Sequence, residues 1–288
     1  MEQHTSNMQN SFQENNRPLE IYLFIDPFCT DCWSLAPLIK KLQLEYGDYF
    51  TLKYVLCGQL AALNSKRPLD FANFPRLKQQ AGNRRIPLQV SSGFDQETFT
   101  PHLAALSIKA AELQGKRAGT KFIHRLQELF FMENADISDI NIIQQCAKYV
   151  DLDMEEFIRD IYSVSAAKAF QCDLKISLEM EVTEMPSLVF FNENIEDEGL
   201  KVTGLYSYSI YVQILTEMLE GYPSPSEMPS LELFLTKNPI IAVNDLALIY
   251  DQPVKQMERQ MKKLQLQQKV KKIRAKNGIF WKYIANSM

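Results

Sequence analysis

Residues 20–37 read EIYLFIDPFCTDCWSLAP, and this stretch decides the fold. The apolar run at 21–25 has the length and composition of a β-strand, and it ends at the Asp-Pro pair of residues 26–27. Cys29 and Cys32 follow, at the start of a segment with helical periodicity. The stretch therefore predicts a strand, a CxxC dithiol and a helix in direct succession.

The place of the dithiol at a helix N-terminus favours thiol chemistry. Unpaired backbone N–H groups and the aligned peptide dipoles stabilise the anionic form of a thiol there. We predict that Cys29 is the more exposed and attacking sulfur, and that Cys32, one turn further in, resolves a mixed disulfide. The two cysteines are redox-active candidates, and the sequence assigns no certain catalytic residue.

Zinc binding is the structural alternative for a CxxC pair. A closed tetrahedral site needs a second pair of ligands, so Cys29 and Cys32 are zinc candidates only as half of a site. We predict neither a certain metal site nor a cofactor. The remaining cysteines and histidines are scattered without ligand spacing, at Cys57, Cys146, Cys172, His4, His102 and His124.

Composition and the N-terminus limit the class of protein. A chain of 288 residues, 46% hydrophobic and 23% charged, has enough core material for one large domain and a smaller companion. Residues 1–18 are polar, without a basic start or an apolar core, and predict a disordered arm rather than a secretory signal. No uncharged apolar run approaches the roughly 18 residues that span a bilayer. We therefore expect a cytoplasmic protein without membrane contact, in which the dithiol is usually reduced.

The segments around the dithiol predict an α/β unit. Helical periodicity continues through Pro37 to Tyr46, Gly47 ends it, and a second strand follows at 51–56. Strand, helix and strand in this order predict a parallel pair with its reactive residues at the carboxyl end of the first strand. Residues 58–93 predict long loops around one or two short helices.

The following segments predict helices and then a return to strands. From 101 to about 180 helix follows helix, with starts at Ser138 and at Asp153. An apolar stripe within this region, which includes Phe122 and Phe130, is interpreted as core. Strands at 188–191 and 200–202 and a helix at 208–219 complete the pattern.

The first 220 residues resemble the DsbA-like branch of the thioredoxin superfamily, in which a helical domain interrupts the thioredoxin fold. The matching features are the CxxC after the first strand, Pro37 in the helix behind it, and Pro186 before the later strands. The resemblance implies that Pro186 is a cis-proline facing the dithiol, with backbone groups free to pair with an extended substrate.

The two residues between the cysteines depart from that branch. Thr30 and Asp31 stand where efficient oxidoreductases have Gly-Pro or Pro-His. A carboxylate beside the dithiol is expected to disfavour the thiolate by like-charge repulsion. This departure argues against vigorous redox catalysis.

The chain continues beyond the DsbA-like part. Residues 221–230, GYPSPSEMPS, have the composition of a linker. The pattern then predicts a short helix starting at Asn244-Asp245, a helix with Pro253 at its first position, and a hairpin turning at Asn277-Gly278. Short helix, turn, helix and hairpin are the outline of a winged helix.

The C-terminal segment 253–288 is strongly basic, with ten basic residues against Glu258 and hence a net charge of +9. This positive charge could equally contact phosphate groups or an acidic protein surface, or simply be solvated by water. Because no base-reading constellation is present, we favour protein contact or a solvated surface over nucleic acid. The ten are Lys255, Arg259, Lys262, Lys263, Lys269, Lys271, Lys272, Arg274, Lys276 and Lys282.

The combination resembles the SpxH family of bacterial adapters, also called YjbH. The Thr-Asp dithiol, the run at 174–180 before Pro186, the segment at 197–202 and the basic tail carry the resemblance, which extends from about residue 18 to 283. Members of this family bind the transcription regulator Spx and promote its degradation by the ClpXP protease. The resemblance therefore implies a non-enzymatic adapter with Spx and ClpXP as partners. The place of the thiols at a helix start adds the hypothesis that oxidation or metal binding at the CxxC modulates the adapter. It assigns no partner-binding surface.

Two other functions compete with the adapter. The CxxC and Pro186 suit a cytosolic thiol-disulfide oxidoreductase of the DsbA-like type, and the basic tail suits a DNA-binding redox sensor. The predicted architecture is α/β: a disordered arm at 1–18, a DsbA-like thioredoxin domain at 19–220 with a helical insertion at about 95–182, a linker at 221–230, and a winged-helix-like basic domain at 231–288.

Overall fold

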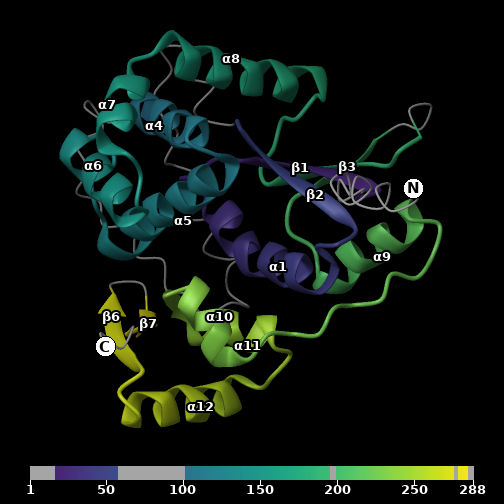
Figure 1. Cartoon of the computed structure of the whole chain (residues 1–288). Coiled ribbons are helices and arrows are strands. Elements are labelled where there is room, and N and C mark those ends of the chain that lie inside the picture. The colour runs from purple at the N-terminus through teal and green to yellow at the C-terminus, as the bar shows by residue number, and fades with distance from the viewer. Residues whose placement is uncertain (1–16, 58–100, 195–198, 276–277, 285–288) are drawn as a thin grey trace, which may run out of the picture.

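The structure is a computed structural model that describes residues 17–57, 101–194, 199–275 and 278–284 (Figure 1). The arm predicted for 1–18 lies outside these residues up to position 16, and the loops predicted for 58–93 lie wholly outside them. None of the helices in the described ranges combines the length and the apolar character that crossing a membrane requires.

A four-stranded sheet forms the centre of the larger part of the molecule, with the strand order β2-β1-β3-β4. β1 and β2 run parallel and are joined by α1, as predicted, whereas β3 is antiparallel to β1 and β4 is antiparallel to β3. The helix α9 closes this part of the chain. The bounds are β1 Leu19–Ile25, α1 Thr30–Tyr46, β2 Phe50–Leu56, β3 Ser187–Phe191, β4 Leu200–Thr203 and α9 Tyr208–Met218.

Both faces of β1 are covered, which explains its nearly continuous apolar sequence. Ile21 and Leu23 point to the face that packs with α1 and α9, where they are buried. Phe24 points to the opposite face, which residues of α8 cover, among them Ile176. The predicted end of α1 is confirmed, because Gly47 is its C-cap.

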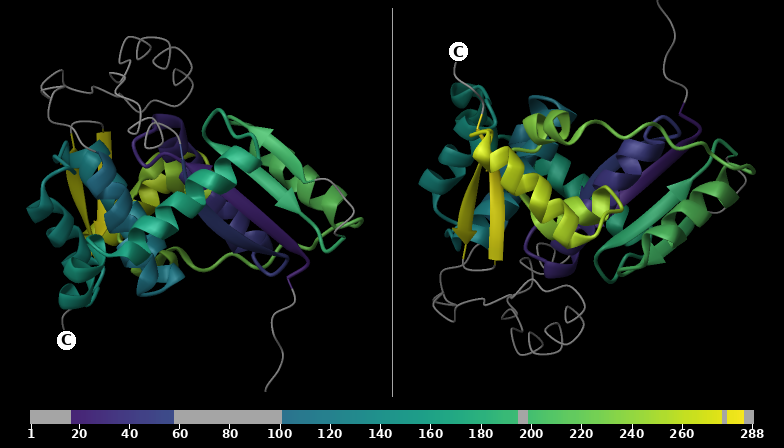
Figure 2. Two further views of the ribbon diagram at one scale, coloured as in Figure 1. Left: turned by 90° about the horizontal axis from the view of Figure 1, so that it is seen from above. Right: turned by 90° about the horizontal axis from the view of Figure 1, so that it is seen from below.

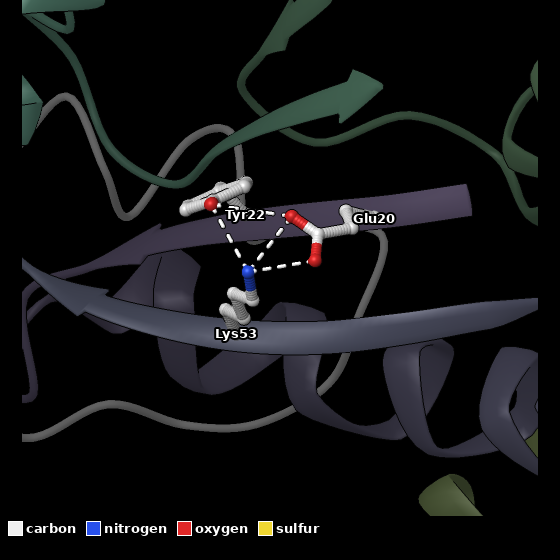
Figure 3. Close-up of polar contacts among 3 residues, drawn as sticks. All are labelled: Glu20, Tyr22 and Lys53. Carbon is white, nitrogen blue, oxygen red and sulfur yellow. Dashed lines mark hydrogen bonds and ion pairs between the residues drawn. The ribbon is translucent and has the colours of Figure 1, made fainter. Parts of the chain in front are cut away.

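A polar cluster at the outer end of β1 ties the two parallel strands together (Figure 3). The Lys53 ammonium donates to both carboxylate oxygens of Glu20, at 2.8 and 2.7 Å, and to the hydroxyl of Tyr22 at 3.1 Å. Tyr22 and Lys53 are directly opposite one another in the strand register. The cluster therefore favours the observed register, although its partial exposure limits its contribution to stability.

Five described helices lie between β2 and β3 and form the region that covers the upper left of Figure 1. The predicted start at Asp153 is confirmed, because its carboxylate accepts a hydrogen bond from the Glu156 N–H at 2.9 Å. The helices are α4 Pro101–Leu113, α5 Lys116–Glu133, α6 Ile140–Tyr149, α7 Met154–Ile161 and α8 Val164–Glu179.

Two helix starts in this region differ from the prediction. The N-cap of α6 is Asp139 rather than Ser138, because the Ser138 N–H and hydroxyl both donate to the Asp136 carboxylate. A break between α7 and α8 was not predicted. There the Ser163 hydroxyl accepts from the Ala166 N–H at 3.0 Å and caps α8.

A buried ion pair ties the helical region to the sheet. The Lys109 ammonium, on α4, lies 2.5 Å from the Asp173 carboxylate on α8 and 2.8 Å from that of Glu112. Asp173 also accepts a hydrogen bond from the Leu56 N–H at the end of β2, at 2.8 Å. Because Lys109 is only 2% exposed, this network joins α4, α8 and β2 away from solvent.

The C-terminal part has a sheet and a hydrophobic cluster of its own. The element order is helix, short strand, two helices and a hairpin, and the sheet order is β5-β7-β6, with both pairs antiparallel. Its cluster centres on Phe234, Met257, Met261 and Trp281. The bounds are α10 Leu231–Lys237, β5 Ile240–Ala242, α11 Val243–Ile249, α12 Val254–Leu266, β6 Val270–Ala275 and β7 Gly278–Tyr283.

This element order agrees with the predicted outline, and its assignment as winged-helix-like stays a prediction. α11 begins at Val243, one residue before the predicted start, and Pro253 is the N-cap of α12 rather than its first residue. The hairpin turn itself, at 276–277, lies outside the described residues.

The two parts of the molecule meet along α1. Figures 1 and 2 show α10 and α11 against this helix. Lys40 and Lys41 of α1 contact Asn238 and Asp251, respectively, and Leu44 packs against the C-terminal hydrophobic cluster.

The predicted linker is itself fixed to the end of α1. The Ser226 N–H donates to the backbone carbonyl of Glu45 at 2.7 Å, and the Ser224 N–H donates to the hydroxyl of Tyr49 at 3.1 Å. Residues 221–230 contain no helix or strand. The segment is therefore irregular in structure but is hydrogen-bonded to the larger part of the molecule.

Candidate thiol site

The turn between β1 and α1 places the dithiol. The Asp26 carboxylate accepts from the Phe28 N–H at 2.9 Å, and the Asp26 carbonyl accepts from the Cys29 N–H at 3.0 Å. Cys29 is the N-cap of α1 in an extended conformation, and Cys32 lies in the first turn. The strand, the dithiol and the helix follow one another as the sequence predicts.

The two thiols differ in exposure and acidity. Cys29 is half-buried, whereas Cys32 is only 4% exposed, which agrees with the predicted order. A hydrogen bond from the Cys32 thiol lowers the pKa of Cys29, and backbone N–H groups of Cys32 and Asp31 act in the same direction. Burial raises the pKa of Cys32 well above its ordinary value. The thiolate therefore forms on Cys29 rather than on Cys32.

The aspartate whose charge opposes this thiolate is Asp26. It is 4% exposed, and its charge raises the pKa of Cys29 and of Cys32. Asp31, in contrast, favours the Cys29 thiolate through its backbone N–H, and burial raises the pKa of its own carboxyl group. On balance the surroundings lower the pKa of Cys29, and the hydrogen bond from Cys32 is the largest cause. The expected repulsion between the Asp31 carboxylate and the thiolate stays a prediction.

Pro186 lies beside the dithiol, preceded by a residue that contacts two cysteines. The Met185–Pro186 peptide bond is cis. The Cys29 sulfur lies 3.9 Å from the backbone oxygen of Met185, and the Cys57 sulfur lies 2.9 Å from the thioether sulfur of Met185. The role of Pro186 in binding an extended substrate stays a prediction.

Cys57 and Asp26 are parts of this site that the sequence reasoning did not single out. Ile25 pairs with Leu56 in the parallel register, so the residues that follow each strand end emerge side by side. The Cys57 N–H donates to the Ile25 carbonyl at 3.0 Å, and burial raises the pKa of the Cys57 thiol. The signal that could have found both residues was their place directly after two parallel strands.

Aromatic side chains of the helical region flank the turn that holds the thiols. The ring centroids of Phe28 and Phe130 are 5.2 Å apart, and those of Trp33 and Phe131 are 5.4 Å apart. Phe122 is fully buried core, as interpreted, whereas Phe130 lies partly exposed at the edge of the thiol site. α5 therefore forms one wall of the site.

The remaining predicted candidates lie apart from the dithiol. Cys146 is buried in α6, where its thiol contacts the Phe122 carbonyl at 3.7 Å, and Cys172 is exposed on α8. Within the described ranges, no three His, Cys, Asp or Glu side chains are grouped closely enough to hold a metal ion. Whether Cys29 and Cys32 bind zinc with ligands from elsewhere stays a prediction.

The hydrogen bond between the two thiols predicts how alkylation of Cys29 depends on pH. Because only the thiolate reacts, the rate rises with pH through the pKa of Cys29, and its midpoint is expected below that of an ordinary cysteine. Replacing Cys32 with Ala removes the donor and should shift the midpoint upward, whereas Cys32→Ser retains a donor and should keep most of the lowering. Iodoacetamide labelling followed by peptide mass spectrometry measures this, and equal midpoints for the two variants would contradict it.

Comparison with known proteins covers nearly the whole chain. A family model described as thioredoxin matches residues 22–213. The ClpXP adapter protein SpxH of Bacillus subtilis is 45% identical over 271 residues, which cover 93% of this chain and 90% of that protein. The ClpXP adapter protein SpxH of a Bacillus cereus strain is 42% identical over 289 residues, covering 97% and 95%, respectively.

Solved structures show the fold of the larger part. A candidate protein disulfide isomerase from Nitrosomonas europaea superposes with a TM-score of 0.57 at 17% identity, covering 70% of this chain and 96% of that one. A candidate DsbA oxidoreductase from Streptomyces coelicolor superposes with a TM-score of 0.51 at 15% identity, covering 74% and 94%. The larger part therefore has the DsbA-like thioredoxin fold that the sequence predicted.

Proposed function

Since the chain belongs to the SpxH family of the thioredoxin fold, we propose that it is an adapter that binds the transcription regulator Spx and promotes its degradation by the ClpXP protease. The observation that carries the proposal is the identity of 42–45% to proteins named ClpXP adapter protein SpxH, over 93–97% of this chain. The cytoplasm, where such a protease works, is the proposed location.

The architecture is compatible with this function. An adapter raises the effective concentration of a client at its protease or stabilises a recognisable conformation of the client, and neither role requires the adapter to make a bond. We propose the division into a thioredoxin domain at 19–220 and a second domain at 231–288, which together offer two surfaces to one client. The buried hydrophobic residues of the two parts form separate clusters, and only partly buried residues such as Leu248 contact both, which supports this division.

A reconstituted degradation assay tests the proposal. Spx and ClpXP are incubated with ATP, with and without this protein, and the loss of Spx is followed over time. We expect the wild-type protein to accelerate degradation, and the double variant Cys29→Ala with Cys32→Ala to do so under reducing conditions to within about twofold, since no bond formation is needed. Absence of acceleration by the wild-type protein would remove the adapter function.

The dithiol is the proposed point of modulation. Oxidation of Cys29 and Cys32 to a disulfide, or binding of a metal ion to them, changes the surface beside Pro186 and so changes the affinity for a client that contacts it. The same assay with oxidised protein measures this. We expect altered acceleration for the wild-type protein and no change for the double alanine variant on oxidation.

A cytosolic thiol-disulfide oxidoreductase is the second candidate function. The lowered pKa of Cys29 and its contact with Met185 beside Pro186 favour it. Reduction of insulin by this protein, measured against dithiothreitol alone, decides between the two. Turnover above that of dithiothreitol alone would support an enzyme. Turnover equal to that of dithiothreitol alone would leave the adapter as the one remaining candidate function.

A further inference from the structure

We propose that the free edge of β6 binds an extended acidic segment of a protein partner, which adds to the small sheet as a further strand. This inference deepens the proposed adapter function, because it names the chemistry of a client segment and the surface that receives it. It rests on three features of β6 as seen in the described parts of the chain: unpaired backbone groups, basic side chains without an acidic partner, and a cross-strand pair of like charges.

Among the residues that the structure describes, none pairs with one side of the β6 backbone. β6 is the outermost strand in the order β5-β7-β6 (Figure 1). The Ile284 N–H donates to the Lys269 carbonyl at 2.8 Å, so in the antiparallel register the odd-numbered residues of β6 face β7. The backbone groups of Val270, Lys272 and Arg274 therefore point outward, and they have no backbone partner within the described parts of the chain.

The side chains along this edge are basic and exposed. Lys271, Lys272 and Arg274 of β6 and Lys282 of β7 are all exposed, and the two strands contain no acidic residue. Within the described ranges, Lys269 alone among the basic residues after position 253 forms an ion pair, with Glu232 at 2.6 Å. The edge therefore offers hydrogen-bonding groups in a field of positive charge that the described residues do not neutralise.

One pair of these charges lies face to face. Lys271 is directly opposite Lys282 in the β6–β7 register. Like charges in this position destabilise a sheet, and the described residues place no carboxylate near enough to pair with either ammonium. A carboxylate from an added strand would relieve this repulsion, which favours an anionic occupant.

The same charges decide which kind of strand can pair with the edge of β6. Lysines on an edge strand oppose pairing with a second copy of the same edge, so they act against aggregation and against self-association through β6. The two edge strands of the larger sheet carry Lys53 and Lys201 rather than acidic residues at their middles, so they do not complement β6 either. An extended segment with acidic side chains satisfies both the backbone groups and the charges.

Peptide binding measured by fluorescence anisotropy tests the proposal with the full-length protein. The probe is a labelled ten-residue peptide of alternating Glu and Thr, and the comparison peptide carries N-methyl groups on alternate backbone nitrogens along one edge. We expect the unmodified probe to bind at low salt, with affinity falling as salt rises, and the N-methylated probe to bind at least about tenfold more weakly. Equal binding of the two peptides would overturn strand addition.

Two variants at Lys272 separate the contribution of the backbone to peptide binding from that of the charge. Lys272→Gln removes the charge and should weaken binding about two- to threefold, because one ion pair at an exposed site contributes little. Lys272→Pro also removes the outward N–H, while leaving the β6–β7 hydrogen bonds, and should weaken binding at least about tenfold. If both variants bind alike, the edge is not the site. Should Lys272→Pro fail to fold, the two peptides on the wild-type protein still decide.

A charge control on α12 separates this edge from a general basic field. The double variant Lys271→Glu with Arg274→Glu should abolish detectable binding, whereas Lys255→Glu with Lys262→Glu, which makes the same change in net charge, should weaken it only slightly. An equal loss in both, or displacement of the peptide by duplex DNA at an equal concentration, would overturn the proposal. If Lys272→Pro loses the peptide but Spx degradation is unchanged, the edge does not receive the client segment, and the adapter function itself stays intact.

Discussion

Replacing Lys109 with Met should lower the free energy of unfolding by about 3–5 kcal/mol, because it leaves the buried carboxylate of Asp173 and the half-buried carboxylate of Glu112 without their shared cation. Lys109 is 2% exposed and contacts both Asp173 and Glu112. Asp173 must remain in place, since it accepts the hydrogen bond from the Leu56 N–H. Urea unfolding followed by circular dichroism measures the effect.

A second substitution and a surface pair control this result. Asp173→Asn in the Lys109→Met background removes the unpaired negative charge and keeps an acceptor for the Leu56 N–H. It should therefore recover part of the lost stability. Lys175→Met on α8 breaks the exposed pair with Glu179 at 3.6 Å and should cost less than about 1 kcal/mol. If Lys109→Met costs no more than Lys175→Met, the buried network does not hold the helical region to the sheet.

The substitution Lys41→Glu should destabilise the contact between the two parts of the molecule by on the order of 3–5 kcal/mol. Lys41 is 3% exposed, and its ammonium contacts Asp251, lies 3.8 Å from Glu45 and lies 4.3 Å from the centre of the Tyr208 ring. A carboxylate in its place would face Glu45 and Asp251 without a cation. The C-terminal part should then release from α1.

Limited proteolysis detects this release at residues 221–230. In the wild-type protein Ser226 of this segment donates to the Glu45 carbonyl of α1, and Ser224 donates to Tyr49 just beyond α1. Both hydrogen bonds should be lost together with the docking of α11. We expect cleavage there to be at least about tenfold faster in Lys41→Glu. Lys237→Glu, an exposed change of the same charge on α10, should leave the cleavage rate unchanged. Equal rates in the two variants would show that Lys41 does not secure the contact.

Local patterns were enough to predict most elements of the fold. The apolar run at 21–25, the dithiol and the periodic segment to Tyr46 each depend on near neighbours in the sequence, and the structure has all three where predicted. Helix starts were less certain wherever two capping residues are adjacent. Ser138 and Asp139 are both good N-caps, and the contact of Ser138 with Asp136 decides between them.

The candidate site was predicted only in part, because it is assembled from distant segments. Cys29 and Cys32 are marked by their spacing and Pro186 by the family resemblance. Asp26, Cys57 and Met185 carry no motif of their own. The parallel register of β1 and β2 brings Asp26 and Cys57 together, and the segment before β3 brings Met185 to them. The short-range periodicity of the sequence specifies neither of these contacts.

The single helix α1 serves both the thiols and the C-terminal part, and Pro37 lies between the two. The thiols occupy its first turn, and the docking residues begin at Lys40. Pro37 has no N–H to donate, so the hydrogen bond toward the carbonyl of Trp33 is missing, and a helix bends most easily at such a gap. We therefore expect α1 to bend at Pro37 when the thiol end moves, rather than to transmit that movement rigidly to the docked end. Oxidation of the dithiol should accordingly leave the seating of the C-terminal part unaltered.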